Sequence, residues 1–193
     1  MAYRHYETVG LVLGHTTHGE ANKLFKVLTS DFGLIMVLAQ GVRLEKSKLR
    51  YNLQNYHLAR LNLIRGKEYW RLTGALEIDK ANREQISFFH KISLIILRLI
   101  HGEEASRFIF SDLEQSWNLL SSEKIQDTGF KPEDLEIFIL VRLLFNLGYL
   151  APSTETETIV GAIDFDWAEV SKVEGNRLDL VSIINSSFVS SGL

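Results

Sequence analysis

The ten residues GVRLEKSKLR, at 41–50, carry four basic side chains and one acidic side chain. The basic residues are Arg43, Lys46, Lys48 and Arg50, and the acid is Glu45. A cluster of cations attracts the phosphates of a nucleic-acid backbone, which carry no sequence information. A solvated polar loop can have the same composition. The segment therefore raises two alternatives, a phosphate-binding surface or an ordinary loop.

A second group of reactive side chains lies in HTTHGE at 15–20, which contains His15, His18 and Glu20. Two histidines on one helical face could hold zinc, but Gly14 and Gly19 argue against a helix here, and the spacing matches no common zinc motif. The chain has no cysteine, which excludes thiolate metal sites and disulfides. We expect no metal and no other cofactor. A metal-dependent hydrolase that uses these histidines is the weakest interpretation.

Length and composition are those of a globular protein. The chain has 193 residues, of which 46% are hydrophobic and 23% charged. The N-terminus MAYRHYETVG is polar, unlike a signal peptide, and the apolar runs ISLIILRLI and IFILVRLLF are each interrupted by an arginine. We therefore expect a cytosolic protein with no membrane partner.

Charge is divided unevenly along the chain. Residues 1–75 contain 11 Lys and Arg against 5 Asp and Glu, whereas residues 76–193 contain 10 against 19. A basic N-terminal part suits contact with a polyanion, and an acidic C-terminal part indicates a separate role. The alternative is that both sets of charges only solvate the surface.

The pattern of apolar residues predicts strands in the basic part. Apolar residues alternate with other residues at 9–13 and 59–63, LIMVLA at 34–39 is a short buried run, and 69–75 is rich in residues that favour strands. Seven of the 13 glycines fall before residue 76, as the turns and bulges of a small closed sheet require. About five strands in this length predict a small barrel.

Beyond Asp79 the apolar spacing becomes helical. Ile86, Phe89, Ile92, Ile96 and Leu99 form an apolar stripe. The sequence also predicts a capping box at Ser111 and Glu114, a helix at 132–147 between Pro132 and Gly148, a polar loop at STETET, and a last helix at 178–188. The predicted fold class is therefore α+β, with a β-barrel followed by an α-helical part.

Several short motifs follow one another in a specific order along residues 3–79. They are YETVGLVLGHTTHGEANKL, TSDFGLIMVLAQGVR, KSKLRYNLQNYHLARLNLIRGK and WRLTGALEID. Their order and spacing resemble the N-terminal region of RecO, a family of bacterial recombination mediators. VRLLFNLGYLAP, at 141–152, is similar to the helix ahead of the zinc region of that family. The resemblance implies a five-stranded OB-fold domain at 1–79 and an α-helical domain at 80–193, in a protein of the bacterial cytosol that associates with the nucleoid.

The resemblance implies a function and also marks two departures. RecO-like proteins are non-enzymatic; they bind single- and double-stranded DNA, promote annealing, and with RecR help load RecA onto DNA covered by single-stranded DNA-binding protein. Many members carry four cysteines after the segment matching LGYLAP, where this chain reads STETETIVGAIDF, so no zinc role is carried over. The chain is also shorter than is usual for the family. Partner sites that depend on the family's additional C-terminal helices are therefore not carried over.

An OB barrel binds single strands with cationic loops and with aromatic side chains that stack on bases, at about 1–3 kcal/mol per base. Beyond the cluster at 41–50, the cationic candidates are Arg65, Lys67 and Arg71. The stacking candidates are Tyr51, Tyr56, Tyr69 and Trp70. Because neighbouring strand residues face opposite sides, we predict that Tyr69 and Arg71 point outward and Trp70 inward, with the opposite facing as the alternative.

The helical part has cations that could receive a partner. The resemblance implies that such domains bind the acidic, hydrophobic C-terminal tail of single-stranded DNA-binding protein, and a basic rim suits that peptide. The available cations are Arg83, Lys91, Arg98, Arg107 and Arg142. Packing of these helices within the fold is the simpler interpretation of their apolar stripes. A protein-interaction adaptor that has kept the barrel but lost DNA binding is the second functional hypothesis.

Overall fold

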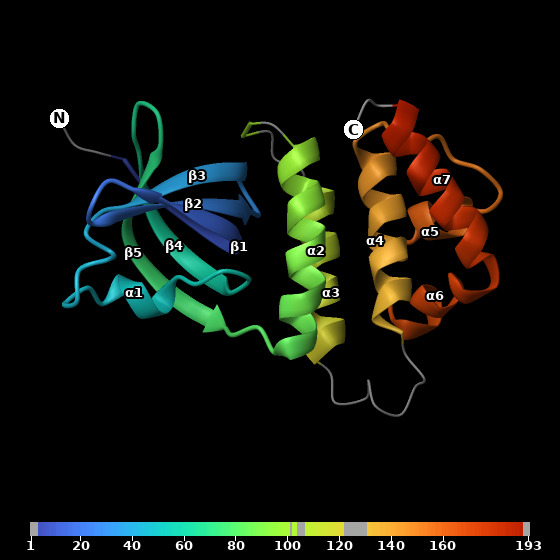
Figure 1. The fold of residues 1–193 in the computed structure, drawn as a ribbon, viewed down its shortest axis with the longest axis horizontal. Coiled ribbons are helices and arrows are strands. Elements are labelled where there is room, and N and C mark those ends of the chain that lie inside the picture. The colour runs from blue at the N-terminus through green and yellow to red at the C-terminus, as the bar shows by residue number, and fades with distance from the viewer. Residues whose placement is uncertain (1–3, 101, 104–106, 122–130, 191–193) are drawn as a thin grey trace. The chain divides into compact units, whose positions relative to one another are not determined.

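The computed structural model describes residues 4–100, 102–103, 107–121 and 131–190 (Figure 1). The chain forms two compact units, Met1–Phe110 and Ser111–Leu193. The elements of the first unit are β1 His5–His18, β2 Asn22–Thr29, β3 Gly33–Ala39, α1 Leu49–Asn52, β4 Leu58–Arg65, β5 Trp70–Asp79 and α2 Arg83–Leu99. α3, Arg107–Ser121, crosses the boundary. The second unit continues with α4 Pro132–Asn146, α5 Glu157–Gly161, α6 Trp167–Ser171, a 3₁₀ turn at Glu174–Asn176 and α7 Arg177–Ser190.

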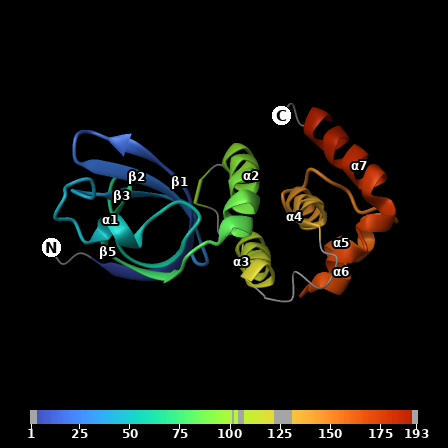
Figure 2. The same ribbon diagram turned by 60° about the horizontal axis from the view of Figure 1, so that its bottom comes forward.

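The five strands close into a barrel in the order β1-β2-β3-β5-β4, and β4 pairs back to β1. Every pair is antiparallel except β3 with β5. Figure 2 shows the strands curving around one interior, and α1 lies in the connection between β3 and β4. This is the OB-fold architecture. The predicted α+β class, with an N-terminal five-stranded OB barrel followed by helices, is confirmed.

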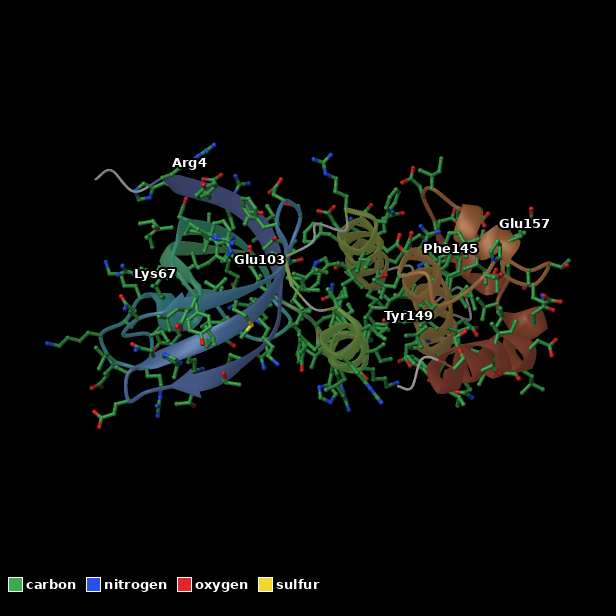
Figure 3. The ribbon with its side chains drawn as sticks, turned by 90° about the horizontal axis from the view of Figure 1, so that it is seen from above. Arg4, Lys67, Glu103, Phe145, Tyr149 and Glu157 are labelled. Atoms are coloured by element: carbon green, nitrogen blue, oxygen red, sulfur yellow. The ribbon has the colours of Figure 1, made fainter. Side chains whose placement is uncertain are left out.

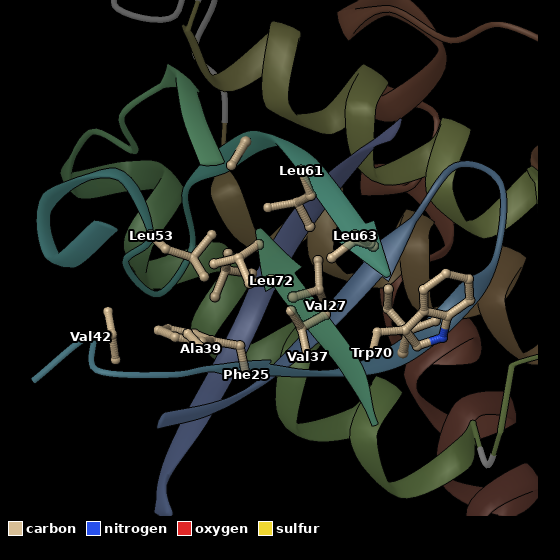
Figure 4. Close-up of a cluster of buried hydrophobic side chains, with 13 residues drawn as sticks. Phe25, Val27, Val37, Ala39, Val42, Leu53, Leu61, Leu63, Trp70 and Leu72 are labelled. Carbon is tan, nitrogen blue, oxygen red and sulfur yellow. The ribbon is translucent and has the colours of Figure 1, made fainter. Parts of the chain in front are cut away.

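The barrel interior is filled by buried apolar side chains, mostly Val and Leu with Phe25 and Trp70 (Figure 4). Figure 4 places Val42 and Leu53 at one end of this core and Trp70 at the other. Both Val42 and Leu53 come from the segment between β3 and β4, so that segment closes its end of the barrel. The side-chain amide of Asn52 in α1 donates to the backbone carbonyl of Ala75 in β5 at 3.0 Å, which fixes the closing segment to the barrel wall.

The first strand is buried on both faces near its middle. Val12 belongs to the barrel core, while Leu11 and Leu13 must point to the opposite side and are buried there as well. α2 contacts β1, and its predicted apolar stripe is buried except at Ile86, which is exposed. Helix α2 therefore groups with the barrel in space, although the predicted domain boundary falls before it, at the end of β5.

Helix α2 begins with a complete capping box. The Asn82 side chain accepts from the backbone N–H of Gln85 at 2.8 Å, and the Gln85 side chain accepts from the backbone N–H of Asn82 at 2.7 Å. The capping box predicted at Ser111 and Glu114 is wrong. α3 starts earlier, at Arg107, so Ser111 lies inside the helix, and its hydroxyl accepts from the Gln115 side chain at 3.3 Å.

The second unit is arranged around α4, which packs against α5, α6 and α7. Pro132 occupies the first turn of α4, as predicted, and Gly148 follows its end with φ +78°, a conformation that favours glycine. The last helix is also confirmed, as α7. In STETET the chain forms turns that lead into α5 at Glu157. None of the described helices is long and apolar enough to cross a lipid bilayer.

A buried ion pair joins α3 and α4 within the second unit. Arg142 of α4 donates to both carboxylate oxygens of Asp112, from Nε at 2.9 Å and from Nη2 at 2.8 Å. Its Nη1 donates to the carbonyls of Ile159 and Ala162 at 2.7 and 2.6 Å. Burial raises the pKa of Asp112, and the hydrogen bonds and charge of Arg142 act in the opposite direction. Arg142 was predicted as an available partner-binding cation; the structure corrects this, because its side chain is 6% exposed and bonded inside the fold.

Candidate nucleic-acid interface

Two connections of the barrel carry most of the predicted DNA-binding residues, and a third connection contacts one of them. We call the three connections the β1–β2 turn (residues 19–21), the β3–α1 loop (40–48) and the β4–β5 loop (66–69). In an OB fold, the β1–β2 and β4–β5 connections flank the outer face of strands 2 and 3, where oligonucleotides bind. How these segments contact one another decides whether their side chains can act on one ligand.

The β3–α1 loop is fixed against the β1–β2 turn. The backbone N–H of Arg43 donates to the carbonyl of Ala21 at 2.9 Å, and its Nη1 donates to the carbonyl of Gly19 at 3.2 Å. The N–H of Gly41 donates to the Asn22 side chain at 2.9 Å. Arg43 is exposed, so its position is set by the backbone while the rest of its guanidinium faces solvent.

Lys46 and Lys48 lie farther along the same loop and are exposed. Two backbone hydrogen bonds form turns within the loop. The N–H of Leu44 donates to the carbonyl of Gly41, and the N–H of Ser47 donates to the carbonyl of Leu44. The backbone of Arg50 is part of α1, but the structure does not describe its side chain. Three of the four clustered cations are therefore placed by the structure on one connection.

The β4–β5 loop reaches the end of β1. The rings of Tyr69 and His18 meet edge to face, with centroids 5.8 Å apart. Tyr69 is half-buried by this contact, and Lys67, labelled in Figure 3, is exposed on the loop. His18 directly precedes the β1–β2 turn, so the ring contact joins the two loops that flank the OB-fold binding face.

The facing predicted at the start of β5 is confirmed for Trp70 and Arg71. Trp70 is 3% exposed and packs in the core against Tyr6 and Phe32, with ring centroids 5.2 and 4.8 Å away. Arg71 is exposed, and its Nη2 donates to the Gln40 side chain at 3.1 Å. Because β5 runs parallel to β3 at this point, Arg71 lies at the base of the β3–α1 loop.

Arg65 has a different environment from the other predicted cations. Its guanidinium lies 4.6 Å from the centroid of the Trp70 ring and forms an ion pair with Glu103, which is labelled in Figure 3. Glu103 also accepts from Trp70 Nε1 at 3.2 Å. These contacts hold Arg65 against the barrel core, so we assign it first to the stability of the barrel.

The other two aromatic candidates, Tyr51 and Tyr56, have different environments. Tyr51 on α1 is 65% exposed. Tyr56 is half-buried, has a positive φ of 63°, and its hydroxyl is hydrogen-bonded to His90 Nδ1 at 2.9 Å. Of these two rings, only that of Tyr51 presents a large free surface to a base.

Three histidines, two of them in HTTHGE, contact residues that are distant in sequence. His15 Nδ1 is hydrogen-bonded to the Asn55 side chain at 2.7 Å, and His18 contacts Tyr69. His57 Nδ1 is 2.9 Å from a carboxylate oxygen of Glu77, a partner 20 residues away in sequence. Among the described residues, no three His, Asp or Glu side chains come together in a group that could hold a metal ion.

Residues 1–79 match the family model described as "Recombination protein O N terminal". A protein named "DNA repair protein RecO" from Dehalococcoides mccartyi strain 195 is 36% identical over 168 residues, which cover 77% of this chain and 66% of the relative. The protein of the same name from strain CBDB1 is 30% identical over 148 residues, covering 75% of this chain and 56% of the relative. The chain belongs to the RecO family.

A third RecO relative, from Heliobacterium modesticaldum, is 28% identical over 150 residues, covering 76% of this chain and 52% of that protein. The chain thus spans between 52% and 66% of the length of these three RecO proteins. The family match ends at residue 79, which is also the last residue of β5. RecO membership is therefore best supported over the barrel that carries the three connections.

Sequence reasoning missed some polar side chains of this RecO barrel. Gln40 supports Arg71, His18 supports Tyr69, and Lys26 is half-buried on β2 opposite Met36 of β3. Lys26 lies on the outer face, because its neighbours Phe25 and Val27 belong to the core. The order of apolar, basic and apolar residues at Phe25, Lys26 and Val27 in β2 was the available signal.

Proposed function

We propose that the chain is a non-enzymatic DNA repair and recombination mediator that binds single- and double-stranded DNA on the outer face of its OB barrel. The observation that carries the proposal is the convergence of the three connections. The β3–α1 loop is bonded to the β1–β2 turn through Arg43, and the β4–β5 loop meets the end of β1 through Tyr69 and His18. Cationic loops around an aromatic side chain are what sequence-independent strand binding requires.

The phosphate contacts in this proposal come from exposed cations on the connections and on β5. They are Arg43, Lys46, Lys48, Lys67 and Arg71. Such contacts hold DNA of any sequence, which is what a protein acting on arbitrary damaged or exposed strands needs. We further propose strand annealing, and cooperation with RecR in loading RecA onto DNA covered by single-stranded DNA-binding protein. The relatives support this only through their name, which refers to DNA repair.

For the acidic tail of single-stranded DNA-binding protein, we propose the exposed side of α2. Leu94 is 59% exposed, with Lys91 three residues before it and Arg98 four residues after it. Residues at these spacings are neighbours on a helix surface, so one apolar side chain lies between two cations. This combination suits a peptide with both carboxylates and apolar groups. Arg83 and Arg107 are also exposed, and Arg142 is excluded by its burial.

The proposal predicts separate effects on binding and stability at Tyr69. Tyr69→Ala is expected to weaken single-strand binding by about 1–3 kcal/mol, because the ring supplies stacking surface. The melting temperature is expected to change little, since the ring lies outside the core. Titration of a fluorescent single strand measures the first quantity, and circular dichroism melting measures the second.

Thr73→Ala is the control, because Thr73 is exposed two residues beyond Arg71 on the same strand. It is expected to leave both quantities nearly unchanged. Wild-type affinity for single strands in a folded Tyr69→Ala variant would argue against stacking on this face.

A further inference from the structure

The closed end of the barrel contains a cavity, and of its described lining residues only Arg43 belongs to the proposed DNA interface. Its volume is about 290 Å³, and its lining residues are Lys23, Phe25, Val42, Arg43 and Leu53. Figure 4 shows Val42 and Leu53 at this end of the core, remote from Trp70. Among the described lining residues, two are cations, three are apolar and none is acidic.

The two cations reach the cavity from different elements. Lys23 pairs with Ala39 of β3, a core residue, so its side chain starts from the inner face of the barrel wall. Its Nζ lies 5.9 Å from the centroid of the Phe25 ring. Arg43 comes from the β3–α1 loop, where two hydrogen bonds to the β1–β2 turn fix it. The described bonds of its guanidinium use one of the five N–H donors that an arginine has.

The ligand that suits this cavity is small and doubly charged. A phosphate monoester carries about −1.5 to −2 charges at neutral pH, whereas each diester of a DNA backbone carries one. Two cations without a lining acid therefore favour a monoester over a diester. The volume lies at the lower end of the range of ligand pockets, about 300–1,000 Å³, which suits a terminal group better than a passing strand.

We propose that this cavity binds the terminal phosphate of a DNA strand, so that the barrel distinguishes phosphorylated ends from hydroxyl ends. This inference rests on the proposed function, because it assumes that the strand lies on the adjacent outer face. Arg43 contributes to both places, since it lines the cavity and is fixed at the β1–β2 turn that flanks that face. Lys23 belongs to the cavity alone.

The test compares the affinities of the full chain for one short single strand with a 5′-phosphate, with a 3′-phosphate, or with hydroxyls at both ends. For the wild type, one phosphorylated form is expected to bind about 10-fold more tightly than the hydroxyl form, which corresponds to about 1.4 kcal/mol. Lys23→Gln is expected to reduce this ratio to about 1, since it removes one cation and keeps most of the side chain.

Lys26→Gln is the matched control, because it lies three residues further along the same strand, removes the same charge and faces outward. It is expected to weaken all three forms alike and to keep the 10-fold ratio. Melting curves establish that both variants fold. A ratio near 1 in the wild type, or an unchanged ratio in Lys23→Gln, would overturn the inference and leave the proposed function intact.

Two further outcomes identify the source of the phosphate and the status of the proposed function. A nucleoside monophosphate that binds as tightly as the phosphorylated strand would overturn the assignment to strand ends in favour of a free nucleotide. Absence of binding to all three strands would contradict the proposed function itself.

Discussion

Arg142→Ala is expected to lower the free energy of unfolding of the second unit by about 3–5 kcal/mol, because it leaves the Asp112 carboxylate buried without its counter-ion. The variant also removes donors from the carbonyls of Ile159 and Ala162. Urea denaturation followed by tryptophan fluorescence measures the effect, since Trp117 and Trp167 lie in this unit. The barrel, which contains Trp70, is expected to keep its own transition.

Removing both charges provides the control for Arg142. In the double variant Arg142→Met with Asp112→Leu, much of the stability is expected to return, because no buried charge is left unpaired. Recovery is expected to be partial, since the two carbonyls still lack their donors. If Arg142→Ala unfolded within about 0.5 kcal/mol of the wild type, as surface substitutions do, the buried pair would not hold this unit together.

The second large effect is expected at Trp70. Trp70→Ala should destabilise the barrel unit by about 3–5 kcal/mol, the usual cost of truncating a buried tryptophan. The substitution removes the packing against Tyr6 and Phe32 and leaves Arg65 without the ring beside it. Thermal unfolding followed by circular dichroism measures the change.

Tyr51→Ala is the matched control for Trp70, since Tyr51 is 65% exposed. It is expected to change stability by no more than about 0.5 kcal/mol. A Trp70→Ala variant that was as stable as the wild type but failed to bind DNA would assign the indole to the binding face instead of the core.

Much of the barrel could be predicted because its signals are local. In β4, Ala59, Leu61 and Leu63 are buried while Arg60 and Asn62 are exposed, as their alternation predicted. The same alternation could not reveal the facing of β1, because α2 buries the outer side as well. A strand that is buried on both faces reads as a continuous apolar run.

The helical part shows what sequence spacing cannot supply. The partner of Arg142 is Asp112, 30 residues earlier, so no residue close to Arg142 in sequence indicates the ion pair. Its position inside the apolar run IFILVRLLF was the available signal, because a helix that is apolar all round is buried. The start of α3 was missed for a related reason, since Ser111 and Glu114 have the spacing of a capping box inside a helix.

The site was predicted as a set of residues, whereas the interactions that assemble it were not. Arg43, Lys67 and Arg71 could be named from composition and strand facing. Tyr69 and His18 are far apart in sequence, and only the closure of the barrel brings their rings together. The ion pair of Arg65 with Glu103 was likewise invisible, because Glu103 follows α2 and comes from another part of the chain.

The central claim is that the connections of the barrel bind the phosphate backbone, and its most direct test is the salt dependence of single-strand affinity. The test variant changes Arg43, Lys46 and Lys48 to glutamine. The control variant changes Arg83, Lys91 and Arg98 of α2 to glutamine, which removes the same charge from exposed positions outside the proposed DNA face. Both are compared with the wild type on strands of unrelated sequence.

Each cation that no longer binds a phosphate of the single strand should reduce the slope of log K against log salt by about 0.7, so the test variant should be flatter by about 2. Its affinity should fall about equally for every sequence, because cations that bind phosphates do not read bases. The control variant should keep a slope close to that of the wild type. A test variant with the affinity and slope of the wild type would contradict the account and would favour a protein-interaction adaptor in which this loop is only solvated.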